Sequence, residues 1–528
     1  MLKPPFQSPK RPCDFEKLLS EKETLIEQKD DIIEKKSQVI EVQQKRINHL
    51  EEYLRLTRRK QFSPSSEVNK QQGELFDEVE LTASETAAET TPSKPAPARK
   101  KGGRKGLSKN IPREQIYINL TDEEKAGAID TFYVVAKEEL DKVPPRVRVL
   151  EYLQEKAVFK EGGKRVIKAA EMPRHPLGKT IASTNLLAHI IIAKYMDALP
   201  LYRQERILSR YGGQISRATM AGWLIRLAVP LQPLVNLLWD HQLGHHYIQM
   251  DETRVQVLKQ KGYLPTGNKY MWVSRGGPPG QPSILFTYDP SRGKEVPARL
   301  LEGFEGTLQS DGYSGYDLTC RSDKITRIGC WDHARRKFKD AQDANPKTRN
   351  KALGATLSDQ AIKKIRALYA IEKSLKAQTA PPEEIYRVRQ EKSKPLLIEL
   401  KQWADENRHK VPKDSLTGKA FTYLCNQWPT LIGYCEDGQL HISNILAENA
   451  IRPFAIGRKN WLFADTPKGA KASALYYSLI ETAKANGLDP FDYLRTMLKQ
   501  LPYATTVEEM EALLPWNIKK ECVEKQVR

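Results

Sequence analysis

The sequence predicts an α/β protein whose core is a mixed five-stranded sheet with helices, preceded by a long coiled-coil helix and a helical region. Three observations predict this class: heptad spacing of apolar residues near the N-terminus, helical periodicity over residues 176–240, and short strand-like runs after residue 246. The 528 residues are enough for several units, at least one with a large hydrophobic core. We expect units at 1–60, 61–110, 111–170, 171–245, 246–470 and 471–528.

The chain is strongly basic, with 85 Lys and Arg against 66 Asp and Glu and a formal net charge of +19. Such a charge suits a polyanionic partner, nucleic acid first, while binding to acidic lipid or solubility alone remains open. The six cysteines are sparse and never spaced as CxxC, so they predict neither a disulfide framework nor a zinc site. The start lacks the apolar stretch of a secretory signal, and Leu186–Ala193 is too short to span a membrane. We expect a cytoplasmic, nucleoid-associated protein.

The first unit, 1–60, has the spacing of a coiled coil. One apolar column recurs every seven residues between about residues 14 and 58, which is typical of helices that pair along a seam. The column four places earlier is weaker, so the number of strands stays open. We favour self-association; a solvated single helix and a helix packed on its own protein are the alternatives. The column consists of Leu19, Ile26, Ile33, Ile40, Ile47 and Leu54.

The second unit, 61–110, has the composition of a disordered linker with a charge switch. Its acidic first half gives way to a basic tract, Lys94 to Lys109, that contains no acidic residue. Arg104 and Lys105 lie there between glycines, an arrangement that suits the minor groove of DNA. A DNA-binding arm and a solvated linker are both open interpretations.

The third and fourth units precede the sheet. Residues 111–170 predict a small mixed unit with strand-like alternation at 146–153. In the helical unit that follows, residues 201–228 place two helices around a Gly-Gly turn, which is helix-turn-helix spacing. Arg217 lies at the start of the second helix, where it can reach a major groove. Any helical hairpin has the same pattern, so this DNA contact stays a hypothesis.

The strand-like runs of the core follow the order strand, strand, strand, helix, strand, link, strand, helix, which is the order of a ribonuclease-H-like fold. Because the first three runs are close together, we expect them to form an antiparallel meander. Asp251 lies in the first strand and Asp311 ends the fourth, its neighbour in that topology, so the two carboxylates are expected to meet at one end of the sheet. The runs are 247–258, 270–274, 283–288, 306–311 and 326–331.

A third acid, Glu448, lies on a predicted helix within residues 443–463, where Asn444 and Arg452 share its face until Pro453 bends the chain. Three unpaired carboxylates would repel one another, but Mg²⁺ prefers oxygen ligands and neutralises such a cluster. Two Mg²⁺ ions, for which Mn²⁺ can substitute, activate a water or a 3′-hydroxyl and stabilise the leaving oxygen at phosphorus. We therefore predict a catalytic, metal-binding trio of Asp251, Asp311 and Glu448.

Four stretches of the chain resemble, in order, the motifs of the insertion-sequence-66 family of DDE transposases. Similarity also occurs after the coiled coil, in the helical unit and in the C-terminal segment, so it covers nearly the whole chain. The resemblance implies a bacterial transposase that binds the terminal repeats of its element and cleaves and joins DNA, with Asp251, Asp311 and Glu448 as its triad. The four stretches are MDET (250–253), LQSDGYSGYD (308–317), GCWDHARRKF (329–338) and LAENAIRPFAIGRKNWLFA (446–464).

The resemblance also implies partners. They are the element's terminal repeats, target DNA, further copies of the chain in a homo-oligomer, and accessory proteins of the same element. Basic residues within the matching motifs are implied DNA contacts near the site, with Trp461 as a weaker candidate. These basic residues are His333, Arg335, Arg336, Arg458 and Lys459.

Two departures from the family pattern bear on the site. Members of the family carry a CPxCG-type zinc unit, whereas residues 111–165 contain no Cys, so zinc is not expected. The family's Asp-Asn-Asn before the helical Glu is replaced by Ser443, Asn444 and Ile445. Residues about 340–430 are polar and helical in pattern and predict an inserted helical subdomain. A nuclease without strand transfer and a catalytically decayed DNA-binding protein are the alternative functions.

Overall fold

The computed structural model describes seven stretches of the chain and divides it into two compact units. The first unit is drawn from Met1–Thr82, Pro173–Gln204 and Arg217–Arg528, and the second from Ala83–Met172 and Glu205–Ser216. The predicted linker, with Arg104 and Lys105, lies outside the described residues. These are 12–62, 115–117, 133–135, 147–161, 164–321, 323–344 and 354–518.

The second unit contains a two-stranded hairpin. Strands β1 (Lys156–Glu161) and β2 (Lys164–Ala169) pair antiparallel. The strand predicted at 146–153 is wrong, because residues 147–155 are not in a strand. Its alternating residues find no partner strand among the described residues, and Val149 is 92% exposed. Alternation alone does not make a strand when no neighbour completes its hydrogen bonds.

The core of the first unit is a mixed sheet with the strand order β5-β4-β3-β6-β7. The first three strands form the predicted antiparallel meander, while β6 runs parallel to both β3 and β7. A two-residue strand, β8 (Phe463–Ala464), adds to the far end of β3, so the sheet has one short strand more than predicted. The others are β3 (Tyr247–Val257), β4 (Lys269–Gly276), β5 (Ser283–Asp289), β6 (Gly306–Gln309) and β7 (Ile325–Ile328).

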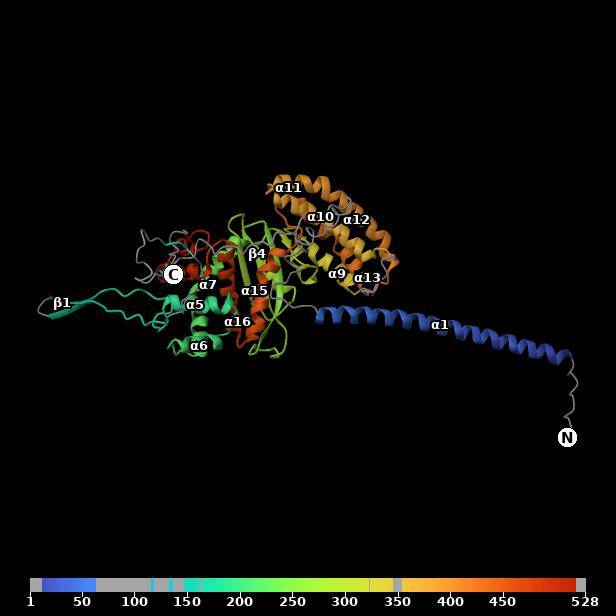
Figure 1. The fold of residues 1–528 in the computed structure, drawn as a ribbon, viewed down its shortest axis with the longest axis horizontal. Helices are drawn as coiled ribbons and strands as arrows, with labels where there is room; N and C mark the ends of the chain where they lie inside the picture. Colours follow the sequence, from blue (N-terminus) through green and yellow to red (C-terminus); the bar gives the residue numbers. More distant parts are fainter. Residues whose placement is uncertain are drawn as a thin grey trace, which may run out of the picture. The chain divides into compact units, whose positions relative to one another are not determined.

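Alternation along β3 decides which side chains meet the site. Ile248 and Met250 are fully buried against α8 (Glu295–Leu300) in one apolar cluster. Successive side chains in a strand point to opposite faces, so Gln249 and Asp251 face the other layer. That layer contains α15 (Ile445–Trp461), which lies beside the central strands in Figure 1.

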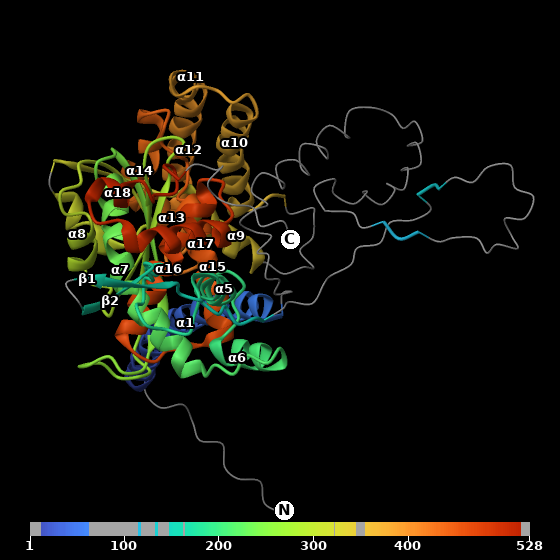
Figure 2. The same cartoon turned by 90° about the vertical axis from the view of Figure 1, so that its left-hand side faces the viewer.

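Long helices cover this face of the sheet. Helix α16 (Pro467–Ala485) packs on β5 and on α7 (Arg217–Leu243), and α17 (Pro490–Gln500) runs beside α16 and α5 (Thr184–Tyr195) in Figure 2. Among the described helices, α7 is long and apolar enough to cross a membrane, but core helices of soluble proteins share these properties. Its leucines are buried against α16 and β5. Shorter elements of this region are α6 (Leu201–Arg210), η8 (Leu501–Tyr503) and α18 (Val507–Glu511).

The residues predicted as an insertion form a helical lobe with its own core (Figure 1). Trp331, Phe338 and Phe421 are buried there. The lobe starts with α9 at Trp331, nine residues before the start predicted near residue 340. Its elements are α9 (Trp331–Asp343), α10 (Leu357–Ala377), α11 (Pro382–Val388), the π-helix η5 (Arg389–Ser393), α12 (Lys394–Asn407), η6 (Arg408–Lys410), α13 (Leu416–Asn426), α14 (Trp428–Leu431) and η7 (Ile432–Glu436).

The N-terminal heptad segment is one helix, α1 (Pro12–Phe62). Its apolar column stays exposed: Ile33 is 60% exposed and Ile40 63%. Near its end, by contrast, Leu56 is buried against α9 and α13, and the Nε of Arg55 donates to the carbonyl of Ala344 at 3.1 Å. The last turns therefore pack on their own protein through a face that differs from the heptad column.

Candidate active site

The first predicted carboxylate, Asp251, lies in the middle of β3. It pairs with Val273 of β4 and its Oδ1 accepts a hydrogen bond from the N–H of Glu252 at 2.8 Å. On the other side of β3, pairing with β6 stops at Gln249. The strand thus continues past its neighbour, which leaves Asp251 beside an opening at the end of β6.

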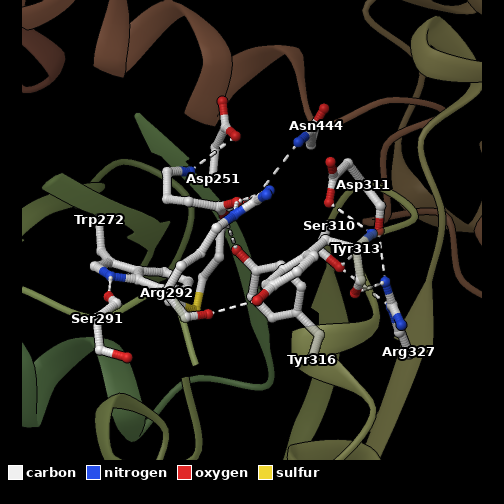
Figure 3. Close-up of polar contacts among 12 residues, drawn as sticks. Asp251, Trp272, Ser291, Arg292, Ser310, Asp311, Tyr313, Tyr316, Arg327 and Asn444 are labelled. Carbon is white, nitrogen blue, oxygen red and sulfur yellow. Dashed lines mark hydrogen bonds and ion pairs between the residues drawn. The ribbon is translucent and has the colours of Figure 1, made fainter. Parts of the chain in front are cut away.

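The second carboxylate, Asp311, occupies that opening two residues after β6 ends. Its Oδ1 accepts a hydrogen bond from the N–H of Tyr313 at 3.0 Å, as Figure 3 shows. The guanidinium of Arg327, from β7, donates to the carbonyls of Asp311 and Tyr313 at 2.6 and 2.8 Å. These hydrogen bonds hold the loop in one conformation, because they engage the N–H of Tyr313 and the carbonyls of Asp311 and Tyr313.

The third carboxylate, Glu448, comes from the first turn of α15 and is only 5% exposed. One of its oxygens lies 3.3 Å from Nη2 of Arg336 and the other 3.5 Å from Nδ1 of His333. Both side chains are on α9, so α9 contacts Glu448 through two residues. The helix continues through Pro453, where a bend was predicted, as far as Trp461. The missing proline N–H removes one bond and leaves the helix intact.

Electrostatic repulsion indicates that the three carboxylates are close together. The pKa of Asp251 is raised well above its ordinary value, first by burial and then by the charges of Glu252, Glu448 and Asp311. A carboxyl group with three acidic neighbours resists ionisation because each negative charge disfavours the next. The structure thus brings all three predicted acids to one place, from β3, the loop after β6, and α15.

A fourth acid, Glu252, was not predicted. Burial and the charge of Asp311 raise its pKa, against the effect of Arg292, whose Nε donates to it at 2.8 Å. The hydroxyl of Tyr316 also donates to Glu252, at 2.9 Å. Figure 3 shows Arg292 and Tyr316 gathered beside Asp251. Alternation along β3 assigns Glu252 to the opposite face from Asp251, so strand periodicity alone did not predict its place at the site.

A buried network of amides sets the position of the Glu448 helix. The side chain of Gln249 donates to Gln309 at 2.8 Å and to the carbonyl of Ser443 at 3.2 Å, and its oxygen accepts from the N–H of Ala447 at 3.2 Å. Gln309 in turn donates to the carbonyl of His441 at 2.7 Å. These bonds join β3 and β6 to the start of α15, so they locate Glu448 relative to Asp251.

The basic residues predicted as DNA contacts lie in different parts of the protein. Arg336 and His333 contact Glu448, whereas Arg335 lies near Tyr369 of the helical lobe. Burial raises the pKa of Tyr369 well above its ordinary value, and the charge of Arg335 opposes this rise only in part. Arg458 is half-buried and Lys459 is exposed, and both line a pocket at the far end of α15. Arg217 is exposed at the start of α7. Trp461 packs edge-to-face on Phe454 and belongs to the core side of α15.

The donor atoms fit a hard divalent cation. Carboxylate oxygens are the ligands that Mg²⁺ prefers, and a cation among them would relieve the repulsion that raises the pKa of Asp251. A second set of donor atoms adjoins the first: the sulfur of Cys330, a ring nitrogen of His333 and an oxygen of Glu448 lie within 4.8 Å of one another. Burial raises the pKa of the Cys330 thiol well above its ordinary value, which favours the protonated form.

Comparison with known proteins places this arrangement in context. Residues 179–472 match the model described as "Transposase IS66 family", 478–516 the "IS66 C-terminal element", and 49–116 "Transposase C of IS166 homeodomain". Three relatives from Sinorhizobium fredii (strain NBRC 101917 / NGR234) are similar over most of their length. The uncharacterized protein y4qI is 31% identical, with 91% of this chain and 90% of the relative covered. The uncharacterized protein y4jD is 30% identical, with 79% and 82% covered.

Proposed function

Because this chain belongs to the IS66 transposase family, we propose that it is the transposase of a bacterial insertion sequence, which binds the element's ends and catalyses metal-dependent cleavage and strand transfer of DNA. The observation that carries the proposal is the gathering of Asp251, Asp311 and Glu448, reflected in the raised pKa of Asp251. Ordinary surface acids lie apart from one another and are ionised in water. Three acids gathered at one end of the sheet strands can bind the metal ions that cleavage of a phosphodiester requires.

The strand order supports a ribonuclease-H-like catalytic core. Three antiparallel strands are followed by two parallel ones, in the order β5-β4-β3-β6-β7. In this topology the central strand and the fourth strand are neighbours, so acids at the middle of one and the end of the other lie at the same edge. The helical lobe is then an insertion between the second and third acids.

We propose Mg²⁺ as the cofactor, held by Asp251, Asp311 and Glu448, with Mn²⁺ as a substitute. When bound, a pair of such ions activates the attacking water or 3′-hydroxyl and neutralises charge at the phosphate. The protein's own contribution is orientation. The N–H of Tyr313 holds Asp311, the amide network of Gln249 positions the helix of Glu448, and Arg336 with His333 fixes the direction of that carboxylate.

Cations close to the carboxylates supply the attraction for DNA. Arg336 is 49% exposed at its side chain while it contacts Glu448, so its remaining N–H groups can reach a phosphate that approaches the site. Arg292 is 40% exposed and paired with Glu252. Each arginine therefore both offsets an acid and offers donors to the substrate, which keeps a negatively charged site accessible to a negatively charged polymer.

The remaining parts fit assembly on two DNA ends. The exposed heptad column of α1 supports a homo-oligomer, and the basic tract with Arg104 and Lys105 is proposed as a DNA-contacting arm. Arg217, at the exposed start of α7, is proposed as a further contact. Accessory proteins of the same element are proposed partners as well.

The test is a strand-transfer assay with purified full-length protein. The substrate is a labelled duplex that carries the inverted repeat found beside the gene, with a supercoiled plasmid as target and Mg²⁺ present. We expect cleavage at the repeat boundary and labelled plasmid as the joined product. Cleavage without joining would identify a nuclease, and specific binding without cleavage a decayed DNA-binding protein; either result would contradict the proposal.

A further inference from the structure

A pocket of 530 Å³ lies at the far end of the β3–α15 pair, away from the carboxylates. This size is in the range of pockets that hold a small molecule or a single nucleotide. Its lining combines three cations with neutral hydrogen-bonding groups and two apolar residues, Val255 and Leu462, and we call it the basic pocket. The residues that matter are Arg254, Gln256, Asn268, Arg458, Lys459 and Leu462.

The three cations of the basic pocket lie close together without an ion-pair partner in the described part of the chain. Among the described residues, no ion pair joins Arg254, Arg458 or Lys459 to a carboxylate. Arg458 uses one nitrogen to donate to the hydroxyl of Thr253 at 3.0 Å and to the carbonyl of Arg254. Burial and then the charge of Arg254 lower the pKa of Arg458. Like charges held together in this way are stabilised by an anion that joins them.

The backbone at the pocket is strained. Leu462, which caps the end of α15, has φ 63° and ψ −52°. A bulky residue with positive φ costs on the order of 1–3 kcal/mol, and such strain is concentrated at ligand-binding positions. The strain turns the chain sharply into β8, which pairs with β3 at Gln256. The pocket is therefore built by β3, which carries Asp251, by α15, which carries Glu448, and by the loop that follows β3.

The distance from the carboxylates follows from these elements. Val255 of the pocket lies four residues beyond Asp251 in β3, about 13 Å along an extended strand. Arg458 lies ten residues beyond Glu448 in α15, about 15 Å along a helix. The distance estimated along β3 and the distance estimated along α15 agree, as expected for a strand and a helix that run side by side. At about 3.4 Å per nucleotide along duplex DNA, and more in an extended strand, this distance corresponds to roughly two to four nucleotides.

We propose that the basic pocket binds a backbone phosphate of the DNA strand two to four nucleotides from the bond that is cut. This inference rests on the proposed function and adds to it a second, discrete contact. Arg254, Arg458 and Lys459 hold the phosphate, Gln256 and Asn268 donate hydrogen bonds, and Leu462 contacts the adjoining sugar. A nucleic acid is favoured over an acidic protein because the pocket continues the line of the catalytic acids on the same strand and helix.

The experiment is phosphate-ethylation interference on the full-length protein without metal, so that binding is read independently of cleavage. The probe is the labelled inverted-repeat duplex. The variant is Arg254→Gln with Lys459→Gln, both exposed residues. The matched control is Lys261→Gln, an exposed lysine between β3 and β4 that does not line the pocket. Lys459→Gln alone is the substitute should the double variant lose its wild-type melting temperature.

We expect ethylation of one phosphate near the cleavage position to block binding by the wild type and to lose this effect in the double variant. The slope of log affinity against log salt should fall by about 2 in the double variant and stay unchanged in Lys261→Gln, since each lost phosphate contact removes about one unit. An unchanged footprint and an unchanged slope in the double variant would overturn the proposal. It would also be overturned if the wild type, but not the double variant, bound an acidic peptide while both proteins bound the duplex equally well. Failure of the wild type to cleave the same duplex with Mg²⁺, while the interference persists, would instead contradict the proposed function.

Discussion

The three carboxylates differ in how firmly the protein holds them. Glu448 is held by two side chains of α9, and Asp311 by a backbone N–H and by the loop that Arg327 secures. Asp251 accepts only from the N–H of its neighbour and has acids around it. The residue with the least support is thus the one whose charge is most disfavoured, and it gains most from a bound cation.

We expect Asp251→Asn, Asp311→Asn and Glu448→Gln each to abolish end cleavage, with a loss of about 10³-fold or more, since removal of a single catalytic group commonly costs this much. DNA binding should change little because no cation is removed. Gel-based cleavage and binding assays measure the two quantities separately. Asp323→Asn, an exposed acid in the connection before β7, serves as the control. Wild-type cleavage by any one of the three variants would remove that residue from the site.

Metal-free stability offers a test that does not depend on activity. Since the pKa of Asp251 is raised in the folded state, its ionisation opposes folding at neutral pH, and this penalty fades as the pH falls through the folded pKa towards the unfolded value near 3.9. Asp251→Asn should therefore raise the melting temperature at pH 7, by about 2–4 °C for each kcal/mol relieved. The gain should shrink at acidic pH, and Mg²⁺ should stabilise the wild type more than the variant. Equal melting temperatures in metal-free buffer at pH 7 would contradict the crowding of acids.

Among the secondary-structure elements, α15 has the greatest effect on the site. Its first turn supplies Glu448 and its last turn supplies Arg458, so one helix relates the carboxylates to the basic pocket. Its position depends on the amide network centred on Gln249, because the N–H of Ala447 and the carbonyl of Ser443 bond to that side chain.

Gln249→Leu should destabilise the protein by about 1–3 kcal/mol, since it leaves buried partners of the amide without hydrogen bonds. The start of α15 should then shift, so that cleavage falls more than stability alone explains. Denaturant unfolding and cleavage at a temperature well below the transition measure both effects. Gln402→Leu, an exposed position in the helical lobe, is the control for stability. Unchanged cleavage in a destabilised Gln249→Leu protein would show that the network does not position Glu448.

Helix α1 presents two faces with different expected roles. The heptad column is exposed, whereas Leu56 packs on α9 and α13. Deletion of residues 1–60 would remove both, so the sharper variant is Ile33→Asp with Ile40→Asp. We expect it to lower the mass measured by light scattering, because charges at the seam of a coiled coil oppose pairing. Val42→Asp, exposed but outside the column, should leave the mass unchanged; an unchanged mass in the double variant would exclude association through this seam.

At the scale of the whole molecule, charge is the property most relevant to function. A net charge of +19 accompanies a site that is itself acidic, so the attraction for DNA comes from cations around the carboxylates. Affinity for the inverted-repeat duplex should fall by about 10³-fold or more between 50 and 200 mM salt if six or more phosphates are neutralised. Fluorescence anisotropy measures this dependence. A flat response would contradict binding along a basic surface.

Much of this organisation follows from local sequence. Heptad spacing predicted the single helix α1, and alternation and turn positions predicted the strands from β3 to β7 close to their observed bounds. These features depend on residues a few positions apart, so the chain specifies them by itself. Asp251 and Asp311 were found for the same reason, because strand order determines which strand ends are neighbours, and the family motifs pointed to Glu448.

Only the tertiary structure decided the rest. Glu252 lies at the site because β6 ends before it and Asp311 comes close to β3 there. The alternation of residues along β3 does not show where the neighbouring strand ends. The strand expected at 146–153 did not form, because no described strand pairs with it. The basic pocket unites residues from β3, the following loop and α15. Periodicity and propensity act over a few residues, whereas burial and charge–charge contacts depend on which distant segments meet.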